Sequence, residues 1–356
     1  MNPVPGIPFP DSIPAPPWVF HILEVFLFTI HLLFINIVLG GSIISFFSRL
    51  RNATSPGPLA EPLRRKLPVL FALAINVGVA PLLFVQVLYG NFFYTSSILM
   101  GRFWIMIVPG VIIAYYAAYV HSRTSTPTLG TIAIGITSAI ALYVAFMFVN
   151  NMLMMMQPER WVGYFGHRAG TLLSTGDRTL MPRYLHFLTA SIAIAALFSA
   201  GVWNDRMKRG NLEAGENVRR SLFIFGTATA IESTIGLWFL TSLKQECMMQ
   251  FLGGDLVSTI ILAVGLLCGI GSIGTAFMGN YRPTVIMAAL TVAAMILTRD
   301  KLRTLYLQGT FDTASLQISE QHDVLVLFLL VLGFGLAAVI WMLKVGFAPS
   351  TQKEKA

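Results

Sequence analysis

Hydrophobic residues recur along this chain in runs long enough to cross a membrane, and short polar segments separate the runs. A run of about 18 or more apolar residues predicts a transmembrane helix, because about 20 helical residues span the hydrocarbon core of a bilayer. The eighth run is the weakest, since it is short and ends in Thr298-Arg299-Asp300. The pattern predicts an all-α, polytopic membrane helix bundle of about nine transmembrane helices. Their expected ranges are 18–47, 68–90, 101–121, 128–156, 182–203, 219–243, 255–278, 282–298 and 322–345.

The same pattern predicts one folded domain. We expect an extended N-terminal lead-in over 1–17, a single transmembrane domain over 18–345 and a cytoplasmic tail over 346–356. The lead-in contains several prolines, which favour extended backbone over helix. No loop between the runs is large enough to form a separate soluble domain.

Composition and charge agree with a membrane protein. The chain is 55% hydrophobic and 11% charged, with a mean hydropathy of +0.72. A net charge of +8 would indicate nucleic acid as a partner of a soluble protein, but here basic residues flank apolar runs, so the expected partner is the lipid bilayer. One set of alternate loops carries 15 of the 24 lysines and arginines. The positive-inside rule then predicts an N-terminus outside and a C-terminus in the cytoplasm of a bacterial-type inner membrane.

Cysteine chemistry is excluded as the basis of a cofactor site. The chain has two cysteines, Cys247 and Cys268, and neither lies in a CxxC or CxxCH motif. The sequence therefore predicts no covalent c-type haem, no cysteine-based metal site and no disulfide framework.

Two histidines lie inside predicted spans and are the main candidates for chemistry. His31 and His186 belong to different helices, and an ionisable residue within a membrane span indicates a functional site. Imidazole is a common axial ligand of haem iron, so we interpret both as haem ligands. Two alternatives remain open. His31 could bind a neighbouring backbone carbonyl, and His186 could form an interfacial pair with Arg183.

Several other residues are weaker candidates. Arg183 lies one turn before His186, where it could bind a haem propionate, because arginine binds carboxylates in bidentate fashion. Glu24 shares a helix face with His31, and Glu232 is an acidic residue deep in a later span, so each is assigned a proton-transfer or structural role. Further possible ligands are His21 and Met152.

The order and spacing of several short motifs resemble those of subunit I of the cytochrome bd quinol oxidases. The first begins at His31 and continues Leu-Leu-Phe-Ile-Asn-Ile-Val-Leu-Gly, and the fifth-helix motif reads Tyr184-Leu-His186-Phe-Leu-Thr-Ala-Ser. The other matching segments are Asn76-Val-Gly-Val-Ala with Gln86 and Gly90-Asn91, Asn151-Met152 with Gln157-Pro158, and Arg219-Arg-Ser-Leu. The resemblance implies that His31 binds a high-spin haem and His186 a low-spin haem b. It also places Gln86 and Asn151 among the cofactor-binding residues and implies a quinone or quinol site.

The chain also departs from that family. No methionine lies in 257–265, where the family has a second haem ligand, and no carboxylate lies in 102–121, where the oxidases have proton-carrying glutamates. The region 294–302 lacks the glutamate ligand of the family's eighth helix. The family has a long quinol-binding loop between spans six and seven. In this chain only about residues 244–255 connect those spans.

These observations favour a haem b-containing subunit that moves electrons between the quinone pool and a redox partner. The expected partner is another membrane or outer-side redox subunit, such as a multihaem c-type cytochrome. One alternative is a true quinol:oxygen oxidoreductase with a rearranged site. The other is a haem-free structural or transport subunit on the same scaffold.

Overall fold

The computed structural model describes residues 10–52, 57–166, 168–211 and 213–347. Nine helical spans in these residues are long and apolar enough to cross a membrane, with α3 and α4 together forming one of them. The spans are α1 (Pro17–Arg51), α2 (Glu61–Leu99), α3 (Gly101–Ile105) with α4 (Ile107–Arg123), α5 (Pro127–Met156), α6 (Leu180–Lys208), α7 (Ala214–Ser242), α9 (Leu256–Phe277), α10 (Tyr281–Leu307) and α11 (His322–Phe347). The predicted all-α bundle of nine spans is confirmed.

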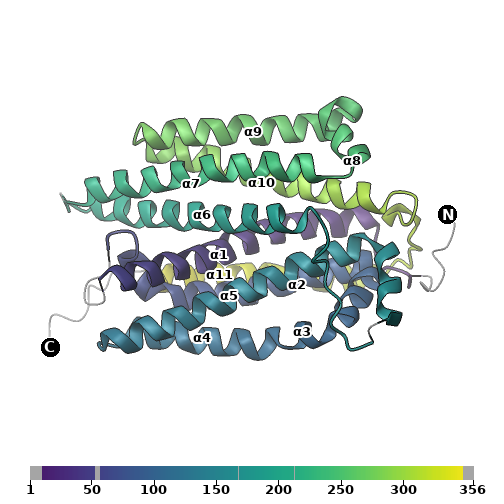
Figure 1. Ribbon diagram of the computed structural model, residues 1–356, viewed down its shortest axis with the longest axis horizontal. Coiled ribbons are helices and arrows are strands. Elements are labelled where there is room, and N and C mark those ends of the chain that lie inside the picture. The colour runs from purple at the N-terminus through teal and green to yellow at the C-terminus, as the bar shows by residue number, and fades with distance from the viewer. Residues whose placement is uncertain (1–9, 53–56, 167, 212, 348–356) are drawn as a thin grey trace.

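Short helical turns connect some of the spans. They are η1 (Pro158–Gly166), α8 (Gln245–Met249), η2 (Gln250–Gly254) and η3 (Thr313–Ser315). Successive spans run in opposite directions, so their ends form two end faces of the bundle (Figure 1). The N-face is the end at which α1 begins, near Pro17, Leu99, Leu180 and Leu307. The C-face is the end at which α1 finishes, near Arg51, Glu61, Lys208 and Tyr281.

The spans form two groups that meet where α1 packs along α6. One group contains α1, α2, α4 and α5, with α11 packed against α2, and the other contains α6, α7, α9 and α10 (Figure 1). Gly40 makes the meeting close, because a Cβ at this position would lie 2.0 Å from the carbonyl oxygen of Ser191. A glycine on a membrane helix lets a neighbouring backbone approach in this way.

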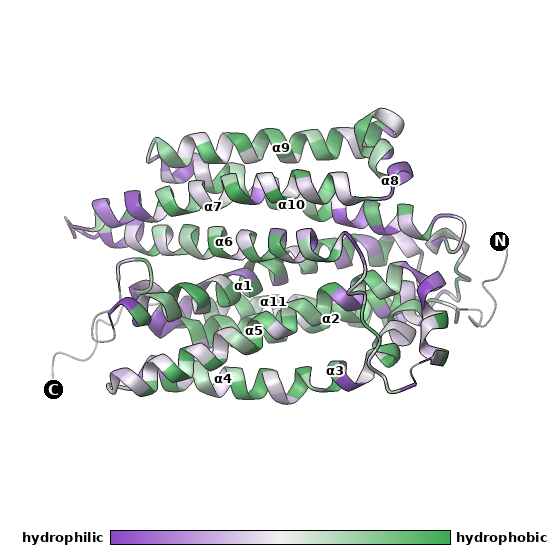
Figure 2. Cartoon of the chain, in the orientation of Figure 1, coloured by the Kyte–Doolittle hydropathy of each residue, from purple (hydrophilic) through white to green (hydrophobic). Residues whose placement is uncertain are grey.

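The outer surface of the bundle is apolar, as a lipid-facing surface must be. None of the most apolar window of α11 is buried in the protein, and its exposed side chains include Leu327, Phe334 and Trp341. Figure 2 shows hydrophobic residues along the middle of the spans and hydrophilic ones near their ends. Helices satisfy their backbone hydrogen bonds internally, which allows them to cross hydrocarbon. The chain is a multi-pass integral membrane protein.

The eighth predicted span ends later than the sequence pattern indicated. The prediction stopped at Thr298, but α10 continues to Leu307. Arg299, Asp300 and Arg303 therefore lie on a helix instead of in a loop. Their charges are neutralised by one another and by α1, which removes the electrostatic reason for the helix to end.

The loop between α5 and α6 is fixed by one aspartate. Asp177 accepts hydrogen bonds from Gln157 Nε2 at 2.8 Å and from the backbone N–H of Thr179 at 2.7 Å, and its Oδ2 lies 2.9 Å from Arg160 Nη2. Burial of the Asp177 carboxyl acts to raise its pKa, but the hydrogen bonds from Thr179 and Gln157 and the charge of Arg160 outweigh burial and lower it. The carboxylate therefore stays charged and holds the loop against the N-face.

The predicted extended lead-in falls largely outside the described residues, as does the predicted tail. Of the lead-in, residues 10–17 are described, and Ile13 forms a parallel bridge with Ile318 in the loop before α11. The backbone N–H of Ile13 donates to Gln317 at 2.8 Å. This contact ties the segment just before α1 to the N-face.

Candidate functional site

His31 lies in the N-face half of α1 and points toward α2. Its Nδ1 is 2.9 Å from the carbonyl oxygen of Ala74. The ring packs against Gly78, where a side chain would not fit, because a Cβ at this position would lie 2.6 Å from the imidazole Cε1. A carbonyl oxygen only accepts hydrogen bonds, so Nδ1 carries the proton and Nε2 has a free lone pair.

His186 lies in the first two turns of α6 and points toward α7. Its Nδ1 is 3.3 Å from the carbonyl oxygen of Glu232. The ring faces Gly236, where a Cβ would lie 3.2 Å from Cε1. The Nε2 atom lies 3.8 Å from Glu232 Oε1, beyond hydrogen-bond distance.

The two histidines share one local design. Each donates Nδ1–H to a helix carbonyl, and each ring occupies the space left by a glycine four residues further along that helix, at Gly78 and Gly236. Within the described parts of the chain, neither Nε2 atom has a hydrogen-bond partner. A metal-binding histidine commonly donates its other N–H to a backbone carbonyl, which fixes the ring and the tautomer. A structural histidine also makes such a bond, but it does not need a free Nε2.

Arg183 provides a second feature that fits a haem. It lies one turn before His186, and its guanidinium carbon is 4.8 Å from the centre of the Phe239 ring. Two of its nitrogens, Nε and Nη2, are buried and have no hydrogen-bond partner among the described residues. The residue as a whole is partly exposed, but buried guanidinium nitrogens without partners are costly. The site therefore fits an additional carboxylate, and haem propionates are carboxylates.

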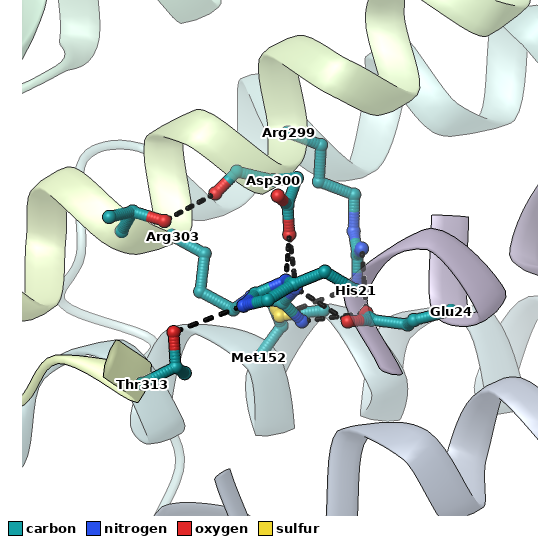
Figure 3. A network of polar contacts seen from close by, with 8 residues as sticks. His21, Glu24, Met152, Arg299, Asp300, Arg303 and Thr313 are labelled. Atoms are coloured by element: carbon teal, nitrogen blue, oxygen red, sulfur yellow. Dashed lines mark hydrogen bonds and ion pairs between the residues drawn. The ribbon is translucent and has the colours of Figure 1, made fainter. Parts of the chain in front are cut away.

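Glu24 and His21 belong to a different site, an ion-pair network at the N-face (Figure 3). Both Glu24 oxygens accept hydrogen bonds from Arg303, each at 2.8 Å, and both side chains are almost fully buried. Arg303 also donates to Asp300 and lies 4.3 Å above the Tyr89 ring. Glu24 is therefore committed to Arg303 and does not orient His31.

The network also contains His21, Arg299 and Met152. His21 Nε2 is 3.0 Å from Thr313 Oγ1, and its Nδ1 is 3.9 Å from Asp300. Arg299 lies 3.9 Å from Glu24 and donates to Met152 Sδ at 3.7 Å. The sulfur of Met152 is thus already engaged by a guanidinium.

The donor atoms of His21, Glu24 and Asp300 all lie within 4.8 Å of one another, as in a metal site. Two arginines already neutralise the two carboxylates, however. We therefore interpret this group as a structural ion-pair network, which cannot hold a cation without losing those pairs.

Gln86 and Asn151 have contacts of their own. Gln86 Oε1 accepts a hydrogen bond from the Tyr94 hydroxyl at 3.0 Å on the exposed side of α2. Asn151 is buried and donates to Ser97 Oγ at 3.1 Å, which joins α5 to α2. Their cofactor-binding roles stay predictions.

Three contributors to these sites were not predicted in their roles. Arg299 and Arg303 were expected to be loop charges, and Gly78 was quoted only as part of the motif that begins at Asn76. The repeated spacing of Arg299-Asp300 and Arg303, one helical turn apart, was the available signal for the first two. The signal for Gly78 was its place in that motif, whereas its contact with His31 had none, because that histidine is 47 residues away.

Comparison with known proteins supports the fold. A scan against protein-family models finds no match, and a search of curated proteins finds none either. Among solved structures, the chain is similar to the structure of bd oxidase from Geobacillus thermodenitrificans, with a TM-score of 0.71 and 14% sequence identity. The match covers 94% of this chain and 98% of that chain. The protein is therefore a helical membrane bundle with the bd oxidase fold, as the sequence resemblance predicted.

Proposed function

We propose that this chain is a haem b-containing membrane subunit of a respiratory electron-transfer complex. It would move electrons between the quinone pool and a redox partner. The observation that carries the proposal is the shared geometry of His31 and His186, each with a fixed Nδ1–H and a free Nε2. The likeness to a bd oxidase supports it by showing a fold that is used in respiration.

Each residue has a defined part in the proposed site. A bound haem b supplies a one-electron redox centre. His31 and His186 would hold haem iron through Nε2, while Ala74 and Glu232 orient their rings through carbonyl oxygens. Arg183 would neutralise a propionate. The Glu232 carboxylate lies beside the His186 ring, where it can hold or release a proton as the charge at the site changes.

A quinol:oxygen oxidoreductase is the second candidate, and the bd oxidase fold favours it. Against it stands the absence of carboxylates from 102–121, because oxygen reduction consumes protons. The haem-free scaffold is the remaining alternative. It leaves the unpaired guanidinium of Arg183 unexplained.

The proposal includes a location and a partner class. We place the protein in a bacterial-type inner membrane, with the N-face outside, because the C-face carries most of the basic residues. The histidines lie in the N-face halves of their helices. A redox partner on that side, such as a multihaem c-type cytochrome, would therefore be nearest to them.

The test is an optical difference spectrum, reduced minus oxidised, of the purified chain, normalised to protein and recorded with and without carbon monoxide. Narrow b-type bands without a carbon monoxide response are expected. His186→Ala should remove a low-spin signal, and His31→Ala a different one. A carbon monoxide-sensitive haem would favour the oxidase instead, and absence of haem from well-folded protein would refute the proposal.

Glycine variants give a sharper test, because they leave both histidines in place. Gly78→Ala puts a methyl group 2.6 Å from the His31 ring, whereas Gly236→Ala meets the His186 ring at 3.2 Å. Loss of the orienting contact should weaken haem affinity about 10–100-fold, more for Gly78→Ala. Gly90→Ala is the matched control on α2, since its nearest neighbour would be 3.8 Å away. Equal haem content in Gly78→Ala and Gly90→Ala would contradict the role of His31.

A further inference from the structure

A basic cavity lies at the C-face, remote from both histidines. It has a volume of about 770 Å³ and opens between the end of α6, the start of α7 and the turn from α9 to α10. Lys208, Arg219 and Arg282 line it, and no acidic residue does.

These three cations differ from their neighbours. Arg209 and Arg220, each next in sequence to one of them, form ion pairs with Asp205 and Glu216 at 2.9 and 3.0 Å. Among the residues that the structure describes, Lys208, Arg219 and Arg282 have no carboxylate within ion-pair distance. All three are exposed. The cavity therefore concentrates unneutralised positive charge.

Two long helices add to this positive potential. The first turns of α7 and α10 both contribute lining residues, among them Gly215 and Tyr281. Neither N-terminus is capped by a side-chain hydrogen bond. The positive end of a helix dipole favours an anion, and this effect is stronger at α10, because Glu213 and Glu216 lie at the start of α7.

An apolar surface continues from the cavity toward the membrane centre. Phe223 lies one turn beyond Arg219 on the same face of α7, and its ring is 5.6 Å from that of Phe277 on α9. Phe223 and Phe277 are exposed, and Met278, which lines the cavity, is 75% exposed. A ligand here meets cations at one end and hydrocarbon-facing side chains at the other.

We propose that this cavity binds the phosphodiester headgroup of an anionic phospholipid, whose acyl chains lie along Phe223 and Phe277. The cationic lining alone would suit any phosphate group. The adjoining apolar surface favours a phospholipid over a free phosphate, because it can contact acyl chains. The assignment is independent of the proposed redox function, and basic pockets between membrane helices bind such headgroups in other proteins.

Native mass spectrometry of the full chain in detergent tests the proposal with added cardiolipin, phosphatidylglycerol or phosphatidylcholine. The cardiolipin and phosphatidylglycerol adducts should persist, and the phosphatidylcholine adduct should not. Arg219→Gln should weaken retention about five-fold, and the triple variant K208Q/R219Q/R282Q roughly a hundred-fold. The charge-matched control R123Q/R209Q/R220Q should retain the lipid, because it removes three other C-face cations.

Three results would overturn the proposal. If the control variant lost as much lipid as the triple variant, the loss would be explained by the lower overall charge and not by this cavity. Equal retention of phosphatidylcholine would remove the role of the anion. Displacement of bound lipid by millimolar inorganic phosphate would assign the site to free phosphate. Unchanged helical circular dichroism of the variants confirms that loss of lipid is not loss of fold.

Discussion

The Arg303 guanidinium is about 1% exposed, so its charge depends on the carboxylates beside it. Glu24 accepts two hydrogen bonds from Arg303, and Asp300 accepts one more. An arginine that loses such a partner keeps its charge and has no solvent to stabilise it. The pair is therefore more important for stability than an exposed pair of the same two residue types.

We expect Glu24→Gln to lower the free energy of unfolding by about 3–5 kcal/mol, because the buried Arg303 charge loses its main partner. The midpoint of thermal unfolding in detergent measures the effect. Glu216→Gln is the matched control, since the exposed Glu216–Arg220 pair contributes little. The double variant Glu24→Leu with Arg303→Met should be more stable than Glu24→Gln. If it is less stable, the network does more than neutralise a charge.

At the level of elements, the segment from Pro158 to Thr179 shows how a long connection is held in place. Asp177 joins the end of α5, the 3-10 helix η1 and the start of α6 through Gln157, Arg160 and Thr179. One carboxylate thus fixes three elements at the N-face. This makes the segment sensitive to the ionisation of a single group.

We expect Asp177→Asn to destabilise this segment by about 1–3 kcal/mol, since charge-assisted hydrogen bonds are lost. In the wild type, the pKa of Asp177 is lower in the folded state than in the unfolded chain. Its contribution is therefore complete above the ordinary aspartate pKa and disappears as the pH falls through the lower folded value. Limited proteolysis of the segment as a function of pH measures this. Cleavage of Asp177→Asn should lack the acid-dependent step, and an identical step in both proteins would refute the assignment.

The hydrophobic pattern predicted where helices exist better than where they end. It placed the eighth span at 282–298 because three charged residues follow, whereas α10 continues to Leu307. Charges normally mark the end of a span, but here Arg299 and Arg303 pair with Glu24, which is nearly 280 residues away in sequence, and Asp300 pairs with Arg303. A short stretch of sequence around residue 298 gives no information about a partner that is so distant in the chain. For the same reason, His31 and His186 could be predicted but their contacts with Gly78 and Gly236 could not.

On the scale of the whole molecule, the two end faces carry unequal charge. Among the residues that the structure describes, the C-face carries 13 lysines and arginines and the N-face carries nine, which predicts that the C-face is cytoplasmic. Because the described residues form an odd number of spans, the first and the last of them, α1 and α11, both run from the outside to the cytoplasm.

Cysteine labelling tests this orientation in intact spheroplasts. In a background without Cys247 and Cys268, Val162→Cys at the N-face should react with a membrane-impermeant maleimide. Ser125→Cys at the C-face should react only after the membrane is opened. Both positions are exposed, so accessibility within the protein is matched. The opposite labelling pattern would place the N-face inside and move the proposed redox partner to the cytoplasm.

The contact of Gly40 with Ser191 bears on the spacing of the two histidine sites. His31 lies about 14 Å along α1 from Gly40, and His186 lies about 8 Å along α6 from Ser191, both toward the N-face. Because the two backbones touch at this point, neither helix can slide without moving the other. Under the proposed function, the distance that an electron crosses between the two sites is thus set by a glycine that takes no part in either. A side chain introduced at Gly40 would push the two helices apart, and on that proposal it would slow electron transfer between two otherwise intact sites.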